Sequence, residues 1–252
     1  MCLILFGWNV LPDTPLVVAA NRDEFHARRT RALSRWPDAP IIGGRDGEAG
    51  GTWMGVNAET PSRVAMVTNV RDGIPATGPR SRGELPVQFL LGAMSPAEFA
   101  GELLTRAQGY APVNVLIGDA EEFWWATNWP RPRLQQVPDG VHGLSNGLLD
   151  SHWPKVDRGR DALSELLLDD PESVDPYLEL LADRDRPADD ALPSTGVPIE
   201  RERDLSPMFI DVRGYGTRAS TVLRVGADGH GDITERRFTY RARRRGTTTI
   251  RF

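Results

Sequence analysis

The sequence is poor in cysteine and lysine and has no long apolar run. Cys2 is the only cysteine among the 252 residues, which excludes an internal disulfide framework and a cysteine-rich zinc site. No apolar stretch approaches the ~20 residues of a membrane span. The start of the chain also lacks the basic leader of a secretory signal. These absences predict a soluble, cytoplasmic protein with no membrane span.

Charge and spacing exclude further classes. The chain has 35 acidic and 30 basic residues and a formal net charge of −5. Nucleic-acid-binding proteins usually carry a basic balance, so we expect no nucleic-acid partner. The four histidines show no metal-ligand spacing, and the chain has no GxSxG, HExxH or P-loop pattern, so we expect neither a metal site nor a serine triad. The sequence leaves the oligomeric state open.

The single cysteine stands directly after Met1. A thiol attacks as the thiolate, and its ordinary pKa is about 8.5. If Met1 is removed, Cys2 also carries an α-amine with a pKa of about 7.7–8.0, which can take the thiol proton and later give it to a leaving group. The alternative is a small buried residue at the start of a strand. Position alone leaves these two interpretations about equal.

Apolar runs and turn signals predict groups of strands followed by groups of helices. Strands are expected at 2–8, 16–20, 50–56, 63–68, 113–118, 122–127, 220–225 and 233–240. Helices are expected at 83–92, from Ser95 onward with a capping box, at 154–168 and at 174–182. The tract 184–203 predicts a long exposed loop, and 241–245 a solvated basic edge. Segregated strand and helix runs predict one α+β domain over residues 1–252, with antiparallel sheets covered by helices.

Polar residues follow the second predicted strand as Asn21-Arg22-Asp23-Glu24. If the first two strands pair, this end comes close to Cys2. Arg22 would then lower the pKa of the thiol, and Asp23 would hold the α-amine. The alternative for the same four residues is a turn with a surface ion pair.

Three other segments offer groups that a site would use. The run Gly50-Gly51-Thr52-Trp53-Met54-Gly55 predicts either a pocket wall with an aromatic face or a hairpin with a core tryptophan. Asn69 and Asn146 each carry an amide that can stabilise an oxyanion, although such residues also form turns. Arg218 has the geometry to bind a carboxylate or phosphate, and its alternative is a structural role.

Taken together and in order, these segments resemble the NRDE family, also called the transport-and-Golgi-organisation protein 2 family. The matching pieces are Met1-Cys2-Leu3, Ala20-Asn21-Arg22-Asp23-Glu24, Gly50-Gly51-Thr52-Trp53-Met54-Gly55, Thr68-Asn69, Ser81-Arg82-Gly83, Gly143-Leu144-Ser145-Asn146, Trp153-Pro154-Lys155-Val156 and Tyr215-Gly216-Thr217-Arg218. The resemblance implies a four-layer αββα sandwich of the N-terminal-nucleophile hydrolase type. In that type the first mature residue attacks an amide or related acyl bond.

The resemblance also implies a set of site residues. The expected catalytic residues are Cys2, Arg22, Asp23, Asn69, Asn146 and Arg218. The expected substrate-binding residues are Asn21, Thr52 and Trp53.

Three functions compete on this basis. The first is a cysteine hydrolase of a small amide or thioester, which needs no cofactor. The second is a carrier of haem or another hydrophobic ligand, since the resemblance links the family to haem trafficking. Such a carrier would use the apolar surface of Trp53, Trp124, Trp125 and Trp129. The third is an interaction scaffold on a retired enzyme fold, for which the sequence offers no partner motif.

Overall fold

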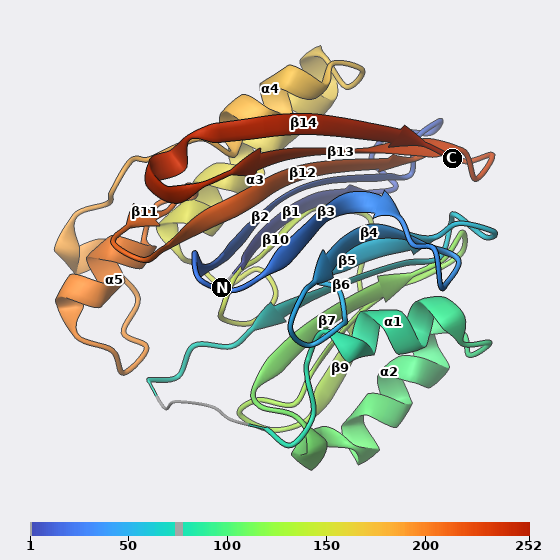
Figure 1. Ribbon diagram of the computed structural model, residues 1–252, viewed down its shortest axis with the longest axis horizontal. Helices are drawn as coiled ribbons and strands as arrows, with labels where there is room; N and C mark the ends of the chain where they lie inside the picture. Colours follow the sequence, from blue (N-terminus) through green and yellow to red (C-terminus); the bar gives the residue numbers. More distant parts are fainter. Residues whose placement is uncertain (1, 74–77) are drawn as a thin grey trace.

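The protein is built as two antiparallel sheets packed face to face, with helices on both outer faces (Figure 1). The structure, a computed structural model, describes residues 2–73 and 78–252. Helices α1 and α2 cover one sheet, and α3 and α4 cover the other. The α+β fold expected from the sequence, a four-layer αββα sandwich, is confirmed.

The first sheet contains the N-terminal strand at an inner position. Its order is β10-β1-β2-β12-β13-β14, with β11 paired to β12. The strands are β1 (Cys2–Trp8), β2 (Leu16–Phe25), β10 (Gly140–Leu144), β11 (Asp211–Val212), β12 (Tyr215–Val225), β13 (Gly231–Phe238) and β14 (Arg244–Arg251). Strand β1 lies between β2 and β10. Cys2 itself pairs with Arg22 of β2, and the pairing with β10 begins at Ile4.

The second sheet is a meander in which strands pair in chain order. Its strands are β3 (Thr30–Arg35), β4 (Ile41–Asp46), β5 (Met54–Asn57), β6 (Val64–Asn69), β7 (Val113–Gly118), β8 (Phe123–Thr127) and β9 (Arg133–Gln136). The apolar pattern predicts none of β3, β4 and β9, nor β10, β11 and β14 of the first sheet. Strands β3 and β9 are largely exposed edge strands in which polar residues predominate. Strand β4 is mostly buried, but its apolar run is only two residues long before Gly43 and Gly44.

The helices follow the predicted pattern closely, with one exception. They are α1 (Glu84–Leu91), α2 (Pro96–Thr105), α3 (Pro154–Asp169), α4 (Val174–Leu180) and α5 (Ile199–Leu205). The capping box at Ser95 is present. The exposed loop expected at 184–203 is wrong in part, because α5 begins within it and Glu202 is buried against Arg71 at 2.9 Å. Of the helices in residues 2–73 and 78–252, none has the length and apolar character that crossing a membrane requires.

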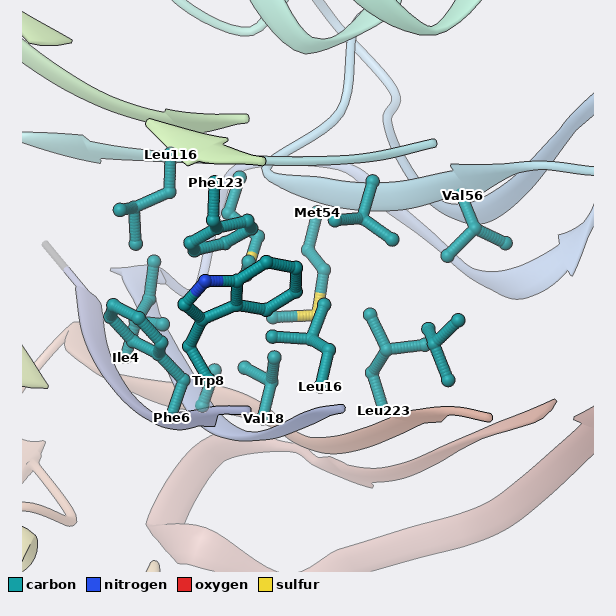
Figure 2. Packing of buried hydrophobic residues seen from close by; sticks show 14 of the residues in the cluster. Ile4, Phe6, Trp8, Leu16, Val18, Met54, Val56, Leu116, Phe123 and Leu223 are labelled. Atoms are coloured by element: carbon teal, nitrogen blue, oxygen red, sulfur yellow. The ribbon is translucent and has the colours of Figure 1, made fainter. Parts of the chain in front are cut away.

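Alternating residues of β1 supply two different cores. Ile4, Phe6 and Trp8 face the second sheet, where Phe6 and Trp8 contact Phe123 with ring centroids 5.3 and 5.4 Å apart (Figure 2). Leu3 and Leu5 face α3 and α4 on the other side. The strand is therefore apolar throughout because both of its faces are covered.

Strand β2 continues five residues beyond its expected end at Ala20. Asn21-Arg22-Asp23-Glu24 lies inside this strand, so the interpretation of these residues as a turn is wrong. Cys2 pairs with Arg22 across the two strands. The polar residues do not end the strand because each finds a partner elsewhere in the fold. The side chains alternate, so Arg22 lies on the face of Cys2 while Asn21 and Asp23 lie on the helix-covered face.

Candidate functional site

Cys2 lies in a pocket of about 440 Å³ formed where the ends of the two sheets meet. The residues around it come from β1, β2, β6 and the segment before β5, and they include Arg22, Thr52, Trp53 and Asn69. Cys2 is partly exposed and forms no disulfide. Six residues that the sequence predicts for a site, Cys2, Arg22, Asp23, Thr52, Trp53 and Asn69, are therefore brought together in one cavity.

Arg22 is held rigidly beside Cys2. Only 5% of its side chain is exposed. It donates to the Thr30 hydroxyl at 2.9 Å and to Asp46 Oδ2 at 3.4 Å. Its guanidinium carbon lies 4.3 Å from the centre of the Trp53 ring, a cation–π contact. These contacts fix a positive charge on the cysteine's face of the sheet.

Burial raises the pKa of the Cys2 thiol above its ordinary value, and Arg22 acts in the opposite direction. The thiol is therefore protonated at neutral pH, and attack on an acyl group requires a base. The α-amine expected for this role depends on removal of Met1, which lies outside the described residues.

The two asparagines expected at the oxyanion lie next to one another but differ in exposure. Asn69 lines the pocket. Asn146 is fully buried, and its side-chain amide donates to the Asn69 main-chain oxygen at 2.7 Å. The neighbouring Ser145 hydroxyl donates to the Cys2 carbonyl oxygen at 3.1 Å. The end of β10 thus connects β1 of one sheet to β6 of the other.

A close backbone contact builds the wall that carries Thr52 and Trp53. The Thr52 hydroxyl donates to the main-chain oxygens of Gly44 at 2.7 Å and Met54 at 2.8 Å. A Cβ on Gly51 would lie 2.3 Å from the main-chain oxygen of Gly83, so only glycine fits there. The Thr52 hydroxyl therefore stabilises its own loop, while Trp53 lines the pocket.

Two predicted residues do not line this pocket and bind main-chain oxygens instead. The Asn21 amide donates to the main-chain oxygens of Leu181 and Met208 at 2.8 and 2.9 Å, beneath the helices. Arg218 donates to the Phe25 main-chain oxygen at 2.9 Å and to that of Arg28 at 3.3 Å. Asn21 therefore fastens the helical layer, and Arg218 fixes the chain where β2 turns into β3.

Asp23 lies at the edge of the site and is almost fully buried. It accepts a hydrogen bond from the Thr217 hydroxyl at 2.7 Å, and burial raises its pKa to about 6. Near it lies Lys155, whose ammonium donates to the Leu205 main-chain oxygen at 2.9 Å and whose pKa burial lowers to about 8. Lys155 has no role in the sequence-based prediction. Lys155 is the only lysine of the sequence and stands at the start of α3, and these two features are the only signal that local sequence offers for it.

The pocket also contains charged residues to which the sequence analysis assigns no role. They are Glu24, Arg28, Asp46, Arg80 and Arg82. Ser81-Arg82-Gly83 is recognisable as a motif, but the approach of this segment to Cys2 depends on tertiary structure. Within residues 2–73 and 78–252, no group of three or more His, Cys, Asp or Glu side chains is placed to hold a metal ion.

The four tryptophans considered for a hydrophobic ligand do not gather in one place. Trp53 lines the Cys2 pocket, and Trp125 is buried in the core between the sheets. Trp124 packs on the core beneath α1 and α2. Trp129 lines a separate pocket of about 680 Å³ together with Trp153.

The fold has four αββα layers, and Cys2 is the first residue of the inner strand β1. Residues 1–240 match the family model described as Transport and Golgi organisation 2. The chain belongs to this family.

Individual relatives cover nearly the whole chain. It is 31% identical to the Bos taurus Transport and Golgi organization protein 2 homolog, over 94% of this chain and 92% of the relative. It is 29% identical to the Homo sapiens homolog, with the same coverage of both chains. A solved structure, the Caenorhabditis elegans N-acylethanolamine-hydrolyzing acid amidase ortholog, aligns over 88% of this chain and 92% of its own. That alignment has 12% identity and a TM-score of 0.44.

Proposed function

We propose that the protein is a cysteine hydrolase that cleaves a small amide or thioester with Cys2 as the nucleophile. The observation that carries this proposal is the position of Cys2. Its thiol lies in a pocket of about 440 Å³ and pairs across the strands with a fixed arginine. A lone cysteine that only filled a core would not need a cavity beside it.

The reaction has two balanced steps. In the first, Cys2 Sγ attacks the acyl carbon, and the α-amine freed by removal of Met1 takes the thiol proton. The amine then passes this proton to the leaving amine or thiol as the acyl bond breaks. In the second, the same amine takes a proton from water, whose oxygen attacks the acyl carbon. The acyl–sulfur bond then breaks and releases a carboxylic acid. The proton returns to the Cys2 thiolate.

The negative oxygen that forms during attack needs a hydrogen-bond donor. We assign this role to the Asn69 side chain, because it lines the pocket. Asn146 acts as a positioning residue, since its amide is directed at the Asn69 main chain. Arg22 provides the fixed positive charge that favours the thiolate.

The proposal is tested on the protein isolated from its own cells. Intact mass should show a chain without Met1, and a screen of amides and thioesters should give turnover that Cys2→Ala abolishes. Cys2→Ala should unfold at the same denaturant concentration as the wild type, since it removes one partly exposed sulfur. Quantitative retention of Met1, or undiminished turnover by Cys2→Ala, would sink the mechanism.

A carrier of haem or another hydrophobic ligand is the second candidate. The observation in its favour is the separate pocket lined by Trp129, Leu148 and Trp153, which offers apolar surface. Titration with haem, followed by the Soret band, should then show saturable binding that Trp153→Ala weakens and Cys2→Ala leaves unchanged. No spectral shift at micromolar haem would exclude this candidate.

A further inference from the structure

Four arginines line the Cys2 pocket, and three of them are neutralised by carboxylates. Arg22 and Arg28 share Asp46, at 3.4 and 2.7 Å, and both lie near Glu24. Arg80 forms an ion pair with Glu84, four residues along the chain. These three charges are accounted for by the protein itself.

Arg82 is the exception among them. In the described part of the chain, no carboxylate lies within ion-pair distance of it. The one hydrogen bond of its guanidinium there is to the main-chain oxygen of Pro112, at 3.2 Å. A guanidinium carries five N–H donors, so most of those of Arg82 are left for another acceptor. The Glu24 carboxylate attracts Arg82 without forming an ion pair with it, and it already lies between Arg22 and Arg28.

Arg82 is also close enough to Cys2 for the two charges to interact. Burial lowers the pKa of Arg82, and negative charge at Glu24 and at the Cys2 thiolate acts in the opposite direction. Such a group is costly to keep in a partly buried place unless an anion joins it. Arg82 is also placed to contact a ligand in the cavity. It lines the cavity from the segment before α1, opposite the sheet that carries Cys2.

We propose that Arg82 binds a carboxylate of the substrate, so that the pocket selects amides or thioesters that carry a second, anionic group. The planar guanidinium offers two parallel N–H bonds that match the two oxygens of a carboxylate. This inference rests on the proposed function, because it identifies the substrate class of the same site. It predicts that neutral acyl compounds of equal size react more slowly.

The test uses two alkylating probes of nearly equal shape, iodoacetate and iodoacetamide. Since Cys2 is the only cysteine, intact mass reports alkylation of this one thiol. The thiolate fraction of Cys2 and the access to its pocket affect both alkylation rates equally. The ratio of the iodoacetate rate to the iodoacetamide rate is therefore independent of them. In the wild type this ratio should exceed that of a short Cys-containing peptide. Arg82→Ala should lower it about tenfold, the size expected for one charge-assisted hydrogen bond.

Two further variants keep the test decisive. Arg82→Lys retains the charge and should lose only part of the preference for iodoacetate. Arg80→Ala removes an arginine of the same pocket that is already paired with Glu84, and should leave the ratio within about twofold of the wild type. An equal ratio in the wild type and Arg82→Ala would overturn the assignment of Arg82. That result would leave the proposed hydrolysis standing, because neither probe requires turnover or removal of Met1.

Discussion

At the end of β2, both faces of the strand carry polar side chains, but the two faces satisfy them differently. Toward the helices, Asn21 and Asp23 are about 1% exposed and bond to groups distant in sequence. Toward the pocket, Arg22 and Glu24 form a longer ion pair, at 3.7 Å, beside a cavity. The helix face thus buries its polar groups almost completely, whereas the pocket face places charged groups beside a cavity.

Among substitutions on the two faces, Asn21→Ala on the helix face should cause the largest loss in the free energy of unfolding. The change leaves two buried main-chain oxygens, of Leu181 and Met208, without their donor and removes the acceptor of the Ser220 hydroxyl. Unsatisfied buried groups cost about 1–3 kcal/mol each, so we expect a loss of about 4 kcal/mol in the free energy of unfolding. Urea unfolding measures it. Ser220→Ala is the matched control, with a loss of about 1 kcal/mol; equal losses in the two variants would contradict this account.

A smaller effect is expected in the pH dependence that Asp23 gives the helix face. Burial raises its pKa from 3.8 to about 6. Between these values the folded chain holds a proton that the unfolded chain has lost. The stabilisation is therefore complete below pH 3.8 and disappears as the pH rises through 6. From pH 4 to 6, the wild type should lose about 2 kcal/mol of unfolding free energy relative to Asp23→Asn. Parallel stability curves for the two proteins would show that Asp23 does not titrate in this range.

The smallest effect is expected on the pocket face, from Glu24→Gln. The Glu24 side chain is 21% exposed and lies 3.7 and 3.8 Å from Arg22 and Arg28, which both retain Asp46. Partly solvated pairs of this kind contribute about 0.5 kcal/mol. Urea unfolding should therefore barely distinguish the variant from the wild type. A loss as large as that of Asn21→Ala would remove the contrast between the two faces.

The sequence predicts the architecture well because its apolar pattern is strong where layers cover both faces. Strand β1 has the predicted bounds, and α2 begins with the predicted capping box. The pattern fails where polar residues are buried. It ends the second strand at Ala20, before Asn21-Arg22-Asp23-Glu24, because the partners at Leu181, Met208 and Thr217 are 160 or more residues away.

The site was predictable only in part for the same reason. Cys2, Arg22 and Asn69 meet in one pocket, as the expected pairing of the first two strands and the position of Asn69 after an apolar strand suggest. Nothing in local sequence shows that Asn21 faces the helices, or that Arg82 reaches the cavity without a carboxylate of its own. Both facts depend on which face of a strand or loop packs against another layer, and tertiary packing decides this.

The position of β1 between β2 and β10 has a consequence for the order of events during synthesis. A ribosome releases the chain from its N-terminal end, so Cys2 emerges long before Ser145 and Asn146, which fasten the site across both sheets. The hairpin of β1 and β2 can form early, but its β10 edge stays open until more than a hundred further residues have been made. The thiol therefore passes through a long interval without its pocket. During that interval the groups that border Cys2 in the folded protein are not yet in place around it.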